Sequence, residues 1–107
     1  MYTSREPGAA VEKAATAEIV EAERRASEAR NRAAYAGLSA ARSFEESALQ
    51  HERVAKVQDQ SVEQGVSDVS VHQRSAAKHR EAAADDRKLA RLKRSESESC
   101  LATDADL

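Results

Sequence analysis

The sequence predicts an all-α protein whose helices pack lengthwise against one another. Small or apolar residues recur at alternating steps of three and four in three segments of the 107 residues, which is the spacing of a helix seam that faces another helix. The chain holds only three glycines and one proline, so few positions interrupt helical structure. Because the three segments have similar lengths, we expect an antiparallel helical hairpin with a third helix packed on it as a three-helix bundle.

The first helix is expected over about 9–36, after a flexible arm at 1–8 that ends with Pro7 and Gly8. Its seam is almost entirely alanine and consists of Ala15, Ile19, Ala22, Ala26, Ala29, Ala33, Ala36 and Ala40. Alanine is the best helix former, but a buried methyl group contributes only about 0.8 kcal/mol, against roughly 1.5–3 kcal/mol for a buried leucine side chain. The sequence therefore specifies the helix strongly and its contacts with other helices weakly.

The second and third helices, expected at about 43–64 and 68–94, form the predicted hairpin. The seam of the second consists of Phe44, Ala48, His51, Ala55, Gln58 and Val62, and that of the third of Val69, His72, Ala76, His79, Ala83, Asp86 and Ala90. Gly65 ends the second helix, and a connector this short makes the two helices antiparallel neighbours. If facing residue numbers add to about 134, a large side chain meets a small one in nearly every layer, and Phe44 and Leu89 anchor the hairpin.

The joint between the first and second helices has two interpretations. Gly37, Leu38 and Ser39 suit a helix stop followed by a new N-cap, which gives the three-helix bundle. In the alternative, helices one and two are continuous through Gly37 as a long rod in an oligomeric coiled coil, because a glycine inside a helix costs only about 1 kcal/mol relative to alanine. The rod would leave its alanine seam without a partner in the same chain, so it would require a second chain.

Residues 9–94 are expected to form a single α-helical domain, followed at 95–107 by a disordered acidic Ser/Glu tail without an apolar period. Cys100 is the only cysteine, which excludes an intrachain disulfide. No apolar run approaches the ~20 residues of a membrane-spanning helix, and residues 1–8 lack the apolar stretch of a signal peptide. We therefore expect a cytoplasmic protein that does not bind a membrane.

Nothing in the sequence points to catalysis, to a cofactor or to a metal. Aromatic residues make up 3% of the chain, too few to line a deep apolar pocket, and no nucleophile motif or glycine-rich phosphate loop is present. His72 and His79 lie seven residues apart, about 10 Å along a helix, which is too far for one metal ion. We expect them and His51 to be half-buried packing residues, with Asp86 within reach of His51 for an ion pair.

The third helix ends in a basic cluster made of Arg87, Lys88, Arg91, Lys93 and Arg94. Cations at a helix C-terminus complement the helix dipole, and this is the simpler interpretation. The alternative is a small nucleic-acid-associated regulator that uses the basic end of helix three. The scarcity of aromatic residues for stacking and the net charge of −2 argue against nucleic acid.

The leading functional hypothesis is a non-enzymatic small helical interaction module. We expect it to self-associate, or to dock a partner protein helix, through the alanine-rich seam of the first helix. Alanine permits close approach between helices, and a chain of this length with an alanine core buries too little apolar area to be more than marginally stable alone. A second copy or another helical protein would supply the missing contacts.

Overall fold

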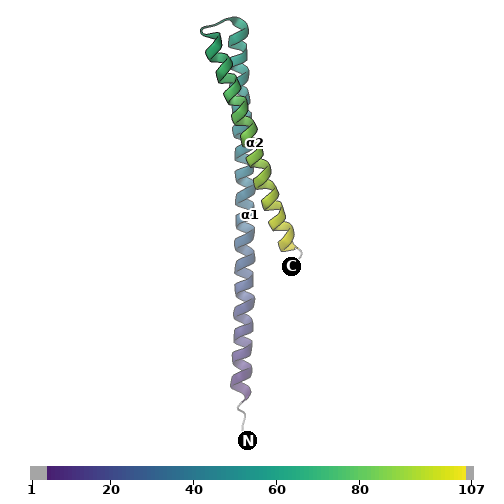
Figure 1. The fold of residues 1–107 in the computed structure, drawn as a ribbon. Helices are drawn as coiled ribbons and strands as arrows, with labels where there is room; N and C mark the ends of the chain where they lie inside the picture. Colours follow the sequence, from purple (N-terminus) through teal and green to yellow (C-terminus); the bar gives the residue numbers. More distant parts are fainter. Residues whose placement is uncertain (1–4, 106–107) are drawn as a thin grey trace.

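The computed structural model describes residues 5–105 and contains, within that range, two α-helices and no strand (Figure 1). Helix α1 spans Arg5–Gln64 and α2 spans Val69–Ala105. α2 folds back antiparallel along the C-terminal part of α1, and the N-terminal part of α1 projects well beyond the end of α2 (Figure 1). The result is an elongated hairpin with principal-axis extents of 101 × 21 × 13 Å.

The expected three-helix bundle is wrong, because the helices predicted at about 9–36 and 43–64 are a single helix. α1 passes through Gly37 without a break, as the alternative of a continuous rod supposed. The physical reason lies on both sides of this glycine. Ala34 and Ala41 are seven residues apart and both are buried, so an interruption between them would break the periodic packing of α1 on α2 in order to save about 1 kcal/mol of helix propensity.

Gly37 serves close packing between the helices. A Cβ atom at this position would overlap Ser97 Oγ and would lie 3.4 Å from Ser97 Cβ and 3.8 Å from the backbone oxygen of Lys93. Ser97 is itself buried, with 5% of its surface exposed. The missing side chain of Gly37 therefore makes room for α2, which a helix-ending role would not require.

Both ends of the helical region extend further than the sequence predicted. Pro7 and Gly8, expected to close a flexible arm, lie in the first turns of α1, where a proline is tolerated because the first N–H groups of a helix have no helical acceptor. Residues 95–105, expected to be part of a disordered tail, continue α2. Their helix is supported by the burial of Ser97 against α1. The rest of the arm and of the tail lies outside the described residues (1–4 and 106–107).

The connector between the helices agrees with its prediction. Gly65 has a φ of +63° and ends α1 with two backbone hydrogen bonds of 3.1 Å each, in the pattern of a Schellman motif. Asp68 caps α2, because its Oδ1 accepts a hydrogen bond of 3.3 Å from the N–H of Val71. These two residues make α2 reverse direction within a few residues, which sets the antiparallel arrangement.

The core between the helices is made of small residues spaced seven apart. They are Ala34, Ala41, Ala48 and Ala55 on α1, and Ala76, Ala83, Ala90 and Ser97 on α2. Among the described residues no large side chain is fully buried. A strict seven-residue repeat winds two helices about each other with a left hand, and small side chains at the repeat let the backbones lie close.

The two seams predicted for the hairpin are the surfaces that face each other. Phe44, His51 and Gln58 are half-buried and alternate along α1 with its buried alanines. Gly37 faces Ser97, and their numbers add to the predicted 134. The hairpin is therefore as expected, although the first helix belongs to the same rod. The pair Gly37–Ser97 agrees with the predicted register, whereas the side-chain contacts His51–His79 and Gln58–His72 join residues whose numbers add to 130.

Candidate functional site

On the N-terminal side of the hairpin, α1 has a stretch without buried residues, residues 10–33, which we define as the projecting segment. None of its residues is buried, whereas Ala34, directly after it, is 3% exposed. Val11 is 68% exposed, and Ile19 and Val20 are each 58% exposed. A helical segment that buries no side chain among the described residues gains little from packing, so its exposed apolar side chains make this segment the candidate interaction surface.

The alanine seam predicted for the first helix lies on this segment and is open to solvent. All of its members except the half-buried Ala40 are exposed, namely Ala15, Ile19, Ala22, Ala26, Ala29, Ala33 and Ala36. Successive residues lie about 100° apart around a helix, so Ala33 and Ala36 lie to one side of Ala34 and Gly37, which face α2. The seam is therefore a second face of α1, distinct from the face that α2 covers.

Charges divide the projecting segment into an acidic and a basic half. Residues 10–23 hold four glutamates and one lysine, a net −3, and residues 24–33 hold four arginines and one glutamate, a net +3. At the boundary, Arg24 pairs with Glu21 at 2.5 Å and with Glu28 at 2.6 Å. The hydrogen bond from Arg24 lowers the pKa of Glu21, and the same bond raises the pKa of Arg24. All three side chains are exposed, so these pairs exchange partners at little cost.

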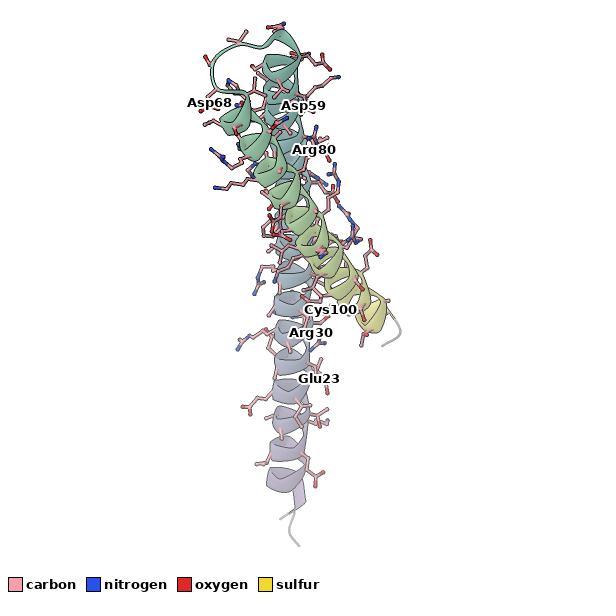
Figure 2. All side chains as sticks on the ribbon, turned by 45° about the horizontal axis from the view of Figure 1, so that its top comes forward. Glu23, Arg30, Asp59, Asp68, Arg80 and Cys100 are labelled. Atoms are coloured by element: carbon pink, nitrogen blue, oxygen red, sulfur yellow. The ribbon has the colours of Figure 1, made fainter. Side chains whose placement is uncertain are left out.

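A ladder of three ion pairs runs along one edge of the hairpin. The pairs are Glu45–Arg94, Glu52–Arg87 and Asp59–Arg80, and Figure 2 labels the last of them. Successive pairs are seven residues apart on each helix, so all three lie on the same edge. The hydrogen bond from Arg87 lowers the pKa of Glu52. The hydrogen bond from Arg80 does the same for Asp59.

Two of the five residues of the predicted basic cluster belong to this ladder. Arg87 and Arg94 each bind a carboxylate of α1, and Lys93 Nζ lies 3.9 Å from a glutamate of α2. Lys88 and Arg91 are exposed. Carboxylates of the same chain therefore balance much of the positive charge at this end of α2.

The three histidines are half-buried, as expected. Across the helices, His51 Nδ1 lies 2.8 Å from His79 Nδ1, and His72 Nδ1 contacts Gln58 Oε1. His51 Nε2 lies 3.8 Å from Asp86 Oδ2, as the register predicted, and this oxygen is buried without a hydrogen-bond partner. In the part of the chain that the structure describes, no group of three His, Cys, Asp or Glu side chains could hold a metal ion.

The two residues expected to anchor the hairpin differ in burial. Phe44 is half-buried between the helices, whereas Leu89 lies on the flank and is 42% exposed. A shallow groove of about 210 Å³ opens between α1 and α2 beside the projecting segment, lined in part by Gly37, Ser97 and the exposed Cys100. Figure 2 shows Cys100 near the C-terminal end of α2, and the labelled Glu23 lies closer to the N-terminal end of α1.

Two features of the site escaped the sequence interpretation although the sequence contains a signal for each. The ladder is visible as acids and arginines at steps of seven in both helices, namely Glu45, Glu52 and Asp59 with Arg80, Arg87 and Arg94. The signal for the close approach at Gly37 is the spacing of Ser97, which lies seven residues after Ala90 and continues the repeat of small residues along α2. Both signals are heptad repeats of polar or very small residues, which a search for apolar periodicity passes over.

Comparison of the chain with protein-family models, with curated proteins and with solved structures finds no match. Within the described residues, neither helix contains a stretch that is long and apolar enough to cross a membrane. Among the surfaces of the chain, the projecting segment is the most distinctive.

Proposed function

We propose that this protein is a non-enzymatic helical interaction module that self-associates, or docks a partner protein helix, through the projecting segment. The observation that carries the proposal is a continuous helix whose alanine seam from Ala15 to Ala36 and whose apolar side chains are exposed among the described residues. Isolated helices are marginally stable in water. Burial of this face against another helix would remove its apolar surface from water and stabilise it.

The hairpin itself contains a helix–helix contact of the kind that we propose. Its own interface consists of alanines at seven-residue spacing on α1 that pack against small residues of α2. The projecting segment offers alanines at the same kind of spacing on the same helix. A helix–helix contact of the type that closes the hairpin could therefore form between chains.

The proposal is tested by the mass of the protein in solution, measured by sedimentation velocity across the micromolar range. We expect a mass above that of one chain. A variant with Ala22→Asp and Ala29→Asp places charge on the seam and should be a monomer. Its matched control, Ala17→Asp with Asn31→Asp, places the same charge on the opposite face of the helix and should keep the wild-type mass. A wild-type protein that is monomeric across the whole micromolar range would contradict self-association.

The second hypothesis, nucleic-acid binding by the basic end of α2, receives less support. Arg87 and Arg94 already bind carboxylates, and a nucleic-acid surface depends on cations that phosphates can neutralise.

A further inference from the structure

We infer that the projecting segment pairs with the same segment of a second copy of this chain, laid antiparallel to it. The inference rests on the proposed function and adds the identity and orientation of the partner. Two properties of residues 10–33 carry it. The spacing of the seam is the same when read from either end, and the flanking charges are complementary to an antiparallel copy.

The seam is symmetric about residue 24. From Ala15 to Ala33 its steps are four, three, four, three and four, so facing residue numbers in an antiparallel pair add to 48. The layers on one side of the symmetry axis are Ala15–Ala33, Ile19–Ala29 and Ala22–Ala26. The largest seam residue, Ile19, thus meets an alanine, and large-to-small layers let helices interdigitate.

The ion-pair ladder of the hairpin shows how flanking charges meet across two antiparallel helices of this protein. Asp59 follows the seam residue Gln58, which faces Ala76 in the register given above. The partner of Asp59 is Arg80, four residues beyond Ala76. In the other two pairs of the ladder, the acid also follows a seam residue and the arginine also lies four residues beyond the facing alanine. This spacing is therefore a property of how the two helices pack.

This relation gives favourable contacts when it is applied to two projecting segments. On one edge, Glu23 follows the seam residue Ala22 and meets Arg30 of the second copy. On the other edge, Glu18 precedes the seam residue Ile19, which faces Ala29 of the second copy. Glu18 therefore meets Arg25, four residues before that alanine. The two-fold symmetry of the dimer repeats each contact. Four pairs form between the chains, and all four join opposite charges.

A parallel copy would place like charges together at the same positions. In a parallel coiled coil, a residue before the seam meets the residue five positions further along the partner helix. Glu18 would then face Glu23, and Arg25 would face Arg30. Flanking charges of this kind set the orientation of coiled coils, and like charges act against the wrong arrangement. The sequence of the segment therefore selects the antiparallel pair.

The ends of the segment also fit this arrangement. The start of the second copy's segment reaches the level of Leu38, beside the groove that Gly37, Lys93 and Ser97 help to line. The two hairpins then lie at opposite ends of the dimer. The new interface continues from the established one, and α2 of each chain keeps its place.

Exchange of charges tests the contacts between the chains. The basic variant carries Glu18→Arg and Glu23→Arg, and the acidic variant carries Arg25→Glu and Arg30→Glu. Because four attractive pairs become repulsive, we expect each variant alone to dimerise at least about tenfold more weakly than the wild type. An equimolar mixture should form a dimer with one chain of each kind. Circular dichroism of each variant checks that its helices are intact. Variants that dimerise like the wild type, or a mixture that stays monomeric, would overturn the inference.

Cross-linking tests the orientation independently. In a Cys100→Ser background, Ala22→Cys and Ala26→Cys are prepared as separate proteins and oxidised alone and mixed. The antiparallel dimer gives a disulfide only in the mixture, between positions 22 and 26, because only these two positions face each other. A disulfide within either variant alone, or none in the mixture, would overturn the inference. A wild type that dimerises while this test fails would leave the proposed function intact.

Discussion

Replacement of alanine by leucine at two positions of α1 separates the covered face from the exposed face. Ala48 is 0% exposed between the helices, whereas Ala29 lies on the exposed seam of the projecting segment. Leucine adds three carbon atoms. At Ala48 these atoms must push apart two helices that lie close, which should lower the free energy of unfolding by about 1–3 kcal/mol. At Ala29 they enter solvent in the single chain, so the change should stay within about 0.5 kcal/mol.

The two variants are compared by thermal melting followed by circular dichroism at a concentration where the chain is monomeric. Since 1 kcal/mol shifts the Tm of a small domain by about 4–8 °C, Ala48→Leu should melt at least several degrees below the wild type. Ala29→Leu should melt close to it. At concentrations where chains associate, Ala29→Leu should also weaken association by over-filling the seam. Equal losses for both variants at low concentration would refute the assignment of the two faces.

Two further predictions concern charge. Because Arg87 and Arg80 lower the pKa values of Glu52 and Asp59, the ladder should stabilise the hairpin fully above about pH 4.5 and lose this effect as pH falls through the lowered values. A double variant Glu52→Gln with Asp59→Asn should show a shallower loss of Tm between pH 5 and 2, and identical slopes would argue against the ladder. Duplex DNA titrated at low salt, where phosphate contacts are strongest, should show no binding by fluorescence anisotropy, and salt-sensitive binding would restore the nucleic-acid hypothesis.

The hairpin was predictable from the sequence because its determinants are local and periodic. Gly65 ends α1 through a left-handed backbone conformation that few other residues adopt, and Asp68 caps the start of α2 with its side chain. Apolar and small residues at alternating steps of three and four then mark the face of each helix that packs against the other. These features depend on residue type and spacing, both of which the sequence states directly.

The joint at Gly37 was not predictable with the same certainty because a glycine has two opposite uses in helices. It ends a helix when its backbone turns left-handed, as Gly65 does, and it lets another helix approach when it stays helical. The second use depends on the residue that lies opposite the glycine, and the sequence pattern places Ser97, which lies opposite Gly37, in a disordered tail. The close approach of Gly37 and Ser97 therefore accounts for two differences from the prediction. The expected first helix continues into the second, and α2 extends beyond residue 94.

The alanine core also determines how the stability of the hairpin varies with temperature. The heat capacity of unfolding arises mainly from newly exposed apolar surface, and among the described residues this core buries no large side chain fully. Its heat capacity change per residue should therefore lie below the usual value of about 12–15 cal/mol/K. A small heat capacity change gives a stability curve with little curvature. The hairpin should consequently lose little stability on cooling, resist cold denaturation, and unfold over a broad temperature range.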